Sequence, residues 1–190
     1  MADSSTGGYL VSTETAFNID HFFHDLIMNL TGLTKTFVRP RWQPNAPVMP
    51  ASNTDWCAFG VTELESDDTA YVDKNAVNTA DLVRHERYSV LCSFYGSSAR
   101  DYLRKMRDGL EIGQNREVLF LNNFGYVTCT PATHAPELIN DIWNDRYDCE
   151  FQFAKEVTKS YTIKDIKYAS TYPIMDGLIN TDTITIVSNS

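Results

Sequence analysis

Apolar residues at helical spacing define the first regular element of this chain. Between Ile19 and Leu30 they recur every three or four positions, which is the period of one helix face. Asn18 or Asp20 can accept the backbone N–H groups that a first helical turn leaves free. Gly32 follows, and glycine commonly ends a helix in the left-handed conformation. The pattern therefore predicts a capped helix that packs on one side.

Alternation between apolar and polar side chains predicts a sheet. In the clearest case, residues 84–95, every second side chain from Tyr88 to Phe94 is apolar or aromatic and would face a core. Further strand-like runs lie at residues 55–64, 124–130, 145–161 and 181–187. In the run 145–161 the alternation becomes more polar after Phe153, so its far end is expected to leave the core or to meet another subunit.

A second helix is predicted directly after the strand at residues 84–95. Gly96 ends the strand, and Ser97 or Ser98 is placed to cap the helix. Asp101 falls in the first turn, where the helix dipole favours an anion. The buried stripe of this helix is expected to consist of Tyr102, Leu103, Met106 and Leu110.

Three further segments give weaker signals. Gly109 and Gly113 both interrupt good helix formers, which predicts close packing, a kink or a break, with a shorter helix over residues 115–121. Residues 136–142 are expected to form a turn of helix. The acidic stretch 66–81 is expected to be a hairpin tip with the start of a return strand.

Proline content and chain length suggest the domain organisation. Four prolines within the segment 38–54 exclude a helix and disfavour a central strand, so this segment is expected to be extended and stiff. Residues 1–17 are small and polar and are expected to form a flexible N-terminal arm. A chain of 190 residues otherwise fits a single domain, here residues 18–190.

Charge and cysteine usage narrow the class of protein. The chain has 16 basic and 25 acidic residues, which gives a net charge of −9. This charge argues against tight binding of nucleic acid through its phosphates, but it suits a protein surface along which DNA passes without being bound.

The four cysteines lie far apart without a CxxC pair, so we expect them to be reduced and structural. The polar N-terminus predicts no signal peptide, and no apolar run approaches the ~18 residues of a membrane span.

No motif in the sequence marks a catalytic, cofactor-binding or metal site, and we predict none of the three. The GxSxG, HExxH, P-loop and GxGxxG patterns are all absent. His21 and His24 could share a helix face, but no further metal ligands accompany them. His85 and His134 stand alone, and the Asp67–Asp68 pair lies in a polar stretch that is expected to be solvated.

Two groups of arginines are candidates for an interface. Arg39 and Arg41 flank a proline close to Trp42, and Trp56 closes the same segment. They predict either a cation–π clamp or interface anchor, or one internal salt bridge with the other arginine in solvent. The second group, on the polar face of the second predicted helix, consists of Arg100, Arg104 and Arg107. These three are expected to meet an acidic neighbour or to line a lumen.

Four segments together resemble the phage neck or tail terminator family, the small structural proteins in the tail modules of long-tailed phages and prophages. They are TGLTKTFVRPRWQP, TDWCAFGV, VLCSFYGSSARDYLRKMRDGLEIGQNREVLF and PELINDIWNDRYDCEFQF. They follow the order of the family and cover most of residues 30–155. Each segment alone is weak, but four in order with the right spacing are specific.

The resemblance implies a fold and a function. The fold would be α+β, with a mostly antiparallel sheet packed by two or three helices and with extended arms. The function would be that of a non-enzymatic virion protein that forms a homo-oligomeric ring, most often a homohexamer, at the head-proximal end of the tail. Such a ring terminates the tail tube and joins it to the head-completion or connector protein, with the sheath as a possible further partner. DNA would only pass through its lumen, and assembly would take place in the host cytoplasm.

Two alternatives remain open at this point. One is a head–tail adaptor or stopper, which is also a virion component. The other belongs to a different class, a small phage-encoded enzyme or host-factor binding protein. An enzyme would show a pocket that converges on His85, His134 or an aspartate pair with perturbed pKa values.

Overall fold

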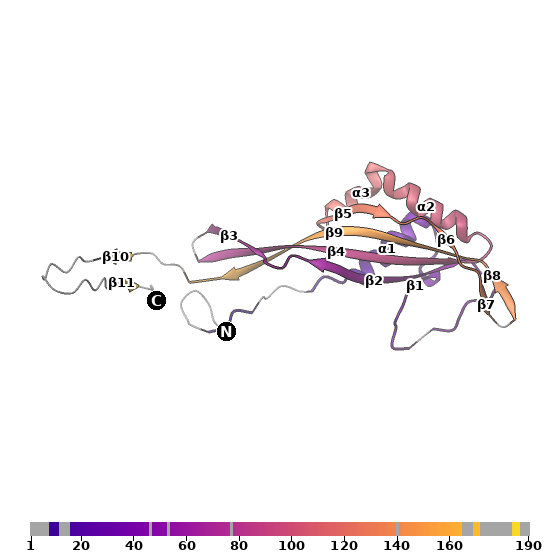
Figure 1. Cartoon of the computed structure of the whole chain (residues 1–190), viewed down its shortest axis with the longest axis horizontal. Helices are drawn as coiled ribbons and strands as arrows, with labels where there is room; N and C mark the ends of the chain where they lie inside the picture. Colours follow the sequence, from indigo (N-terminus) through magenta and orange to yellow (C-terminus); the bar gives the residue numbers. More distant parts are fainter. Residues whose placement is uncertain are drawn as a thin grey trace, which may run out of the picture. The chain divides into compact units, whose positions relative to one another are not determined.

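A computed structural model describes residues 8–11, 16–45, 47–52, 54–76, 78–139, 141–164, 169–171 and 184–186 (Figure 1). The chain forms two compact units. The larger unit comprises Ala16–Asp68 and Arg84–Val157, and the smaller draws its described residues from Met1–Thr15, Thr69–Val83 and Thr158–Ser190. The predicted division into an arm at residues 1–17 and a single domain at 18–190 stays a prediction.

A mixed sheet forms the framework of the chain. Its strand order is β1-β2-β4-β9-β5, and β1 pairs with β2 in parallel while the other pairs on this path for which the register is given, β2–β4 and β5–β9, are antiparallel. The bounds of these strands are β1 Val38–Pro40, β2 Trp56–Ser66, β4 Thr79–Tyr95, β5 Phe124–Cys129 and β9 Arg146–Thr162. The strands predicted at residues 55–64, 84–95, 124–130 and 145–161 are confirmed. The α+β prediction is confirmed as well, since three helices pack on this sheet.

The three helices lie on one face of the sheet in the larger unit. They are α1 Ile19–Thr31, α2 Ala99–Glu111 and α3 Gly113–Phe120. The predicted caps of α1 are confirmed: the Asn18 side chain accepts from the His21 N–H at 3.0 Å, and Gly32 takes a φ of 81°. The predicted break between Gly109 and Gly113 is also present, because Ile112 is extended and separates α2 from α3.

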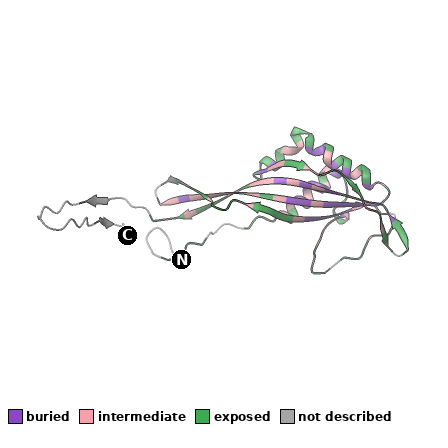
Figure 2. Cartoon of the chain, in the orientation of Figure 1, coloured by how far each residue is buried: buried purple, intermediate pink, exposed green. Residues whose placement is uncertain are grey.

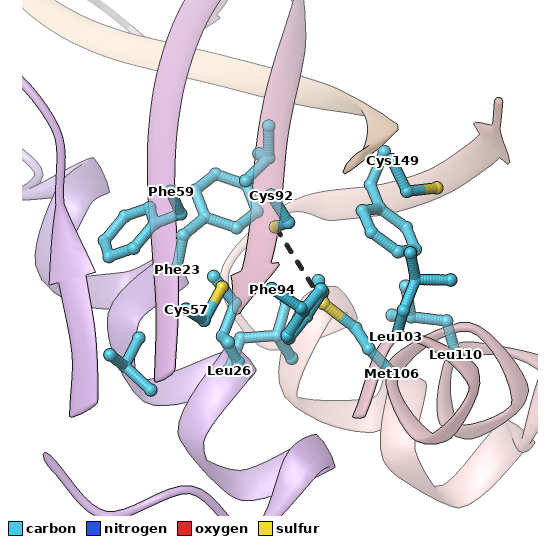
Figure 3. Close-up of a cluster of buried hydrophobic side chains, with 14 of the residues drawn as sticks. Phe23, Leu26, Cys57, Phe59, Cys92, Phe94, Leu103, Met106, Leu110 and Cys149 are labelled. Atoms are coloured by element: carbon cyan, nitrogen blue, oxygen red, sulfur yellow. Dashed lines mark hydrogen bonds between the residues drawn. The ribbon is translucent and has the colours of Figure 1, made fainter. Parts of the chain in front are cut away.

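The hydrophobic core fills the space between these helices and β2, β4 and β9 (Figures 2 and 3). Alternate strand residues face it, so that Cys57 lies opposite Phe94 and Phe59 opposite Cys92 in the β2–β4 register. Full burial of one such phenylalanine stabilises the fold by about 1.5–3 kcal/mol. Leu103, Met106 and Leu110 contribute the buried stripe predicted for α2, while Tyr102 is only partly buried.

The cysteines behave as small core residues. All four are free thiols, and Cys57, Cys92 and Cys149 are buried. The Cys92 thiol lies 4.0 Å from the Met106 sulfur (Figure 3). Burial raises the pKa of Cys92 well above its usual value and that of Cys149 to about 12, so both stay protonated at neutral pH. The burial of Cys57, Cys92 and Cys149 fits the structural role predicted for the cysteines, and their reduced state stays a prediction.

The start of α2 differs from the sequence prediction. Ser98 occupies the capping position, but its side chain makes no capping hydrogen bond. Instead Asp55 Oδ1, at the start of β2, accepts from the Ser98 N–H at 2.9 Å. The cap therefore comes from a residue that is distant in sequence and that becomes a neighbour only when β2 pairs with β4.

The turn of helix predicted at residues 136–142 is wrong. The segment forms a two-stranded hairpin of β7 Glu137–Ile139 and β8 Ile142–Asn144, in which Leu138 lies opposite Trp143. Asp141 takes a left-handed φ of 60°, which Asp tolerates better than most residues and which turns the chain back on itself. Local turn chemistry therefore overrides the weak helical period.

Strand pairs in the smaller unit correspond to two further predictions. β3 Tyr71–Ala76 lies inside the acidic stretch 66–81, for which a hairpin tip and the start of a return strand are predicted, and it pairs with β4, with Tyr71 opposite Val83. β10 Ala169–Thr171 pairs with β11 Ile184–Ile186, which lies inside the strand predicted at residues 181–187. The remaining residues of that run lie outside the described residues.

Candidate functional site

The helix-free face of the sheet carries four stacked arginine and aromatic side chains. β1, β2, β4 and β9 lie side by side and contribute Arg39, Trp56, Tyr95 and Arg146, respectively. The Trp56 and Tyr95 rings stack with centroids 4.3 Å apart and planes 6° apart. The Arg39 guanidinium lies 5.8 Å from the Trp56 ring centre, and that of Arg146 lies 5.9 Å from the Tyr95 ring centre. We call these four residues the arginine–aromatic ladder.

A chain of hydrogen bonds runs beside the ladder across the same face. Arg41 donates to the Ser93 hydroxyl, which donates to Asp148. Asp148 also accepts from Arg146 Nε at 2.9 Å and from its terminal nitrogen at 2.6 Å. Burial by itself would raise the pKa of Asp148, but hydrogen bonds from Arg146 and Ser93 outweigh that effect and hold this pKa below its usual value. The carboxylate is therefore a fixed anion at neutral pH.

Arg39 also ties the proline-rich segment to the sheet. Its Nε donates to the Thr36 carbonyl at 3.0 Å, and a terminal nitrogen donates to the Val48 carbonyl at 2.7 Å. The strand of this segment, β1, lies at the edge of the sheet, where proline is tolerated because the missing N–H has no ladder partner to lose. The cation–π alternative for Arg39 is confirmed, and neither Arg39 nor Arg41 forms an ion pair within the described residues.

Trp42 is an exposed aromatic residue on the same face. Its side chain is 72% exposed, and its backbone takes a φ of 57°, a left-handed value that is unusual for a bulky residue. The indole lies over Gly60, where a Cβ atom would come within 2.7 Å of two ring carbons. Trp42 is thus a large aromatic surface held in a fixed position, and tryptophan is enriched among the residues that dominate binding energy at interfaces.

A basic groove lies on the helix side of the larger unit. It has a volume of about 350 Å³ and is lined by Arg100, Arg104 and Arg107 of α2 together with Leu103, Ala132, His134 and Tyr147. Arg104 lies 3.7 Å from Asp101, whereas Arg100 and Arg107 form no ion pair within the described part of the chain. His134 stacks on Tyr147 and lies 3.1 Å from Asp145. The groove therefore presents two uncompensated guanidinium groups.

An acidic groove lies at the end of β2. It has a volume of about 520 Å³ and is lined by Glu65, Ser66, Asp67, Asp68, His85, Glu86, Arg87 and Ala154. Asp67 accepts from the backbone N–H of His85 at 2.9 Å and from its ring at 3.0 Å. These hydrogen bonds lower the pKa of Asp67 and keep it ionised. His85 and the Asp67–Asp68 pair therefore line one groove, which is the convergence that the enzyme alternative calls for, and His85 Nε2 also lies 3.7 Å from Glu156 Oε2.

The structure brings some of the sequence-predicted interface residues together and separates others. Arg39, Arg41, Trp42 and Trp56 gather on the helix-free face, while the three α2 arginines lie in the basic groove. Their role at an interface stays a prediction. Sequence reasoning missed Tyr95, Arg146 and Asp148 as members of this face. All three occupy strand positions between core residues, so the period of two places them on the side of the sheet opposite the core.

Among the described residues, no three His, Cys, Asp or Glu side chains are arranged to hold a metal ion. In the same part of the chain, no helix has the length and apolar character that a membrane crossing requires.

Comparison with known proteins supplies the identity of this sheet-and-helix unit. A family model described as phage neck terminator protein matches residues 18–177, which takes in α1, α2, α3 and the whole of β2, β4 and β9. The chain belongs to the phage neck terminator family. No curated protein matches it in a sequence search. Membership makes the chain a structural protein of the phage neck, located in the virion and acting with other phage head or tail proteins, and it confirms the family predicted from the four sequence segments.

Proposed function

We propose that this chain forms a homo-oligomeric ring, a hexamer, at the head-proximal end of the phage tail. The ring stops growth of the tail tube and presents a surface to the head-completion or connector protein. The observation that carries this proposal is the match to the neck terminator family over residues 18–177. That range includes both faces of the sheet and therefore every surface described above.

A closed ring requires two different complementary surfaces on each subunit, because each contact joins unlike patches of neighbouring copies. The larger unit offers surfaces on both sides of its sheet. The helix-free face carries the arginine–aromatic ladder and Trp42, and the helix side carries the basic groove. A fixed, exposed indole beside arginines is the composition that dominates binding energy at protein interfaces.

The proposed partners follow from this position in the virion. They are other copies of the chain, the tail tube protein, the head-completion or connector protein and, in a contractile tail, the sheath. DNA only passes through the lumen, and the net charge of −9 supports passage without tight phosphate binding. The role is structural and non-enzymatic, with no cofactor.

Deletion of the gene tests the proposed function. We expect unjoined heads and tails, with tails of uncontrolled length in electron micrographs, and restoration of both properties by the wild-type gene supplied in trans. Length control separates this role from that of a head–tail adaptor, whose loss would leave unjoined tails of normal length. Normal-length tails joined to heads after deletion would overturn the proposal.

A further inference from the structure

The basic groove and the acidic groove of the larger unit share one strand, β9, but lie at different places along it. Tyr147 of β9 lines the basic groove and Ala154 of β9 lines the acidic one. Seven residues separate them, so the grooves are roughly 23 Å apart along the strand at about 3.3 Å per residue. Side chains of one groove therefore cannot reach those of the other within one subunit.

The two grooves are complementary in charge. Within the described part of the chain, three arginines and no carboxylate line the basic groove, whereas four carboxylates and one arginine line the acidic groove. Within the acidic groove, Glu65 pairs with Arg87 at 3.0 Å and Asp67 with His85, but Asp68 forms no ion pair in the described part of the chain. Glu86 accepts a hydrogen bond from the Tyr88 hydroxyl but is likewise in no ion pair of the described part of the chain. Arg100, Arg107, Asp68 and Glu86 are thus the groups of these two surfaces whose charge is left for an outside partner.

We propose that these two surfaces dock on each other between copies of the chain, so that the basic groove of one subunit receives the acidic groove of the next. This inference rests on the proposed ring. The contact is head to tail, since it joins unlike patches, and repetition of such a contact can close a ring. Arginine suits this contact because its planar guanidinium can engage a carboxylate through two parallel hydrogen bonds.

A second copy fits the basic groove better than nucleic acid does. The chain carries a net charge of −9, which disfavours binding of a phosphate backbone overall. The complementary acidic surface is present on every copy and at a fixed distance from the basic one. Opposite charges at such a contact accelerate association and set its register.

Charge reversal tests this pairing. The first variant carries Arg100→Glu with Arg107→Glu, and the second carries Glu65→Arg with Asp68→Arg. Matched controls are Lys105→Glu, on α2 but outside the basic groove with its ammonium 4.8 Å from the Tyr102 ring centre, and Glu111→Lys, exposed and outside both grooves. Association is measured by light scattering and sedimentation, and folding by circular dichroism.

We expect each reversal variant to stay folded and to associate roughly tenfold or more weakly, because like charges then face each other. Mixing the two variants should restore association, since each reversed groove meets a groove of opposite charge on the other variant. The chain that carries all four substitutions should recover association for the same reason. Both controls should associate like the wild type, and the wild-type contact should weaken between ionic strengths of about 0.05 M and 0.5 M.

Several results would overturn the inference. Reversal variants that associate normally, a mixture that stays dissociated, or a wild-type chain that remains monomeric at its highest soluble concentration would each do so. Binding of a labelled DNA duplex that is lost on arginine reversal, with self-association unchanged, would assign the groove to nucleic acid instead. Unchanged rings with intact tail-length control would remove this pairing and leave the proposed function standing.

Discussion

At the scale of single residues, Trp42 and Gly96 show how local backbone geometry prepares a surface. Trp42 holds a left-handed backbone and lays its indole on Gly60, so most of the ring faces outward. Gly96 has a φ of 101°, and a Cβ atom there would clash with Asp55 Oδ1. One residue exposes an aromatic surface, and the other allows β4 to turn directly into α2.

Replacing Gly96 with alanine should destabilise the protein by roughly 2–3 kcal/mol, because the new Cβ combines a strained φ with a clash against Asp55. The matched control is Gly113→Ala at the start of α3, where no atom lies within 4 Å of the added Cβ. That change should be neutral or mildly stabilising. Urea unfolding measures both, and equal stabilities for the two variants would contradict the account of Gly96.

Trp42→Ala should leave stability within about 1 kcal/mol of the wild type, because most of the side chain is already in solvent. Its effect should appear in assembly, which is expected to weaken because a large aromatic contact is lost. Urea unfolding and sedimentation measure the two properties on the same sample. A variant that unfolds readily, or that assembles as well as the wild type, would show that Trp42 is not an assembly anchor.

At the scale of secondary-structure elements, the start of α2 and the ladder depend on strand pairing. The capping carboxylate of Asp55 reaches α2 only because Trp56 pairs opposite Tyr95, immediately before Gly96. The same pairing stacks the two rings of the ladder and places Arg39 and Arg146 at its ends. The helix cap and the ladder are therefore each built from residues that are distant in sequence.

Asp55→Ala should destabilise the protein by about 1 kcal/mol, the usual effect of losing a helix N-cap acceptor. Ser98→Ala should have little effect, since the Ser98 side chain makes no capping hydrogen bond. Denaturant unfolding of the pair distinguishes the two possible caps. A larger loss of stability for Ser98→Ala than for Asp55→Ala would show instead that Ser98 caps the helix, as the sequence predicts.

Stability should decrease in acid through Asp148. Its pKa is lower in the folded than in the unfolded protein, so its contribution is fully present above the unfolded value, close to 4, and is lost as pH falls through the folded value. Asp148→Asn removes the titrating group and should flatten this acid limb while lowering stability at neutral pH. Unfolding curves measured from neutral pH to about pH 3 test this, and parallel acid limbs for the two proteins would contradict it.

Local signals predicted most of the fold, and long-range pairing explains what they missed. The caps of α1 and the alternation in β4 and β9 are properties of neighbouring residues, so they are readable from sequence. The Asp55 cap and the joining of Arg146 to Tyr95 depend on strand register, which no short segment encodes. The β7–β8 hairpin depends on a left-handed Asp141, which a weak helical period concealed.

At the scale of the whole molecule, the chain carries a basic groove and an acidic groove at separate places. It also has a helix-free sheet face with stacked aromatic rings and the exposed Trp42. Its core needs no disulfide, since all four cysteines are free. Membership of the phage neck terminator family gives this arrangement its setting in the virion neck. A subunit with unlike surfaces at different places suits repeated head-to-tail contacts, which is the basis of the proposed ring.

We propose above that copies of this chain form a ring at the head-proximal end of the tail. Electron microscopy of isolated tails, with the subunit labelled through an added tag, tests it most directly. We expect label in a closed ring at that end alone, with the tube ending beneath it. Label along the tube, at the distal end, or only on heads would contradict it.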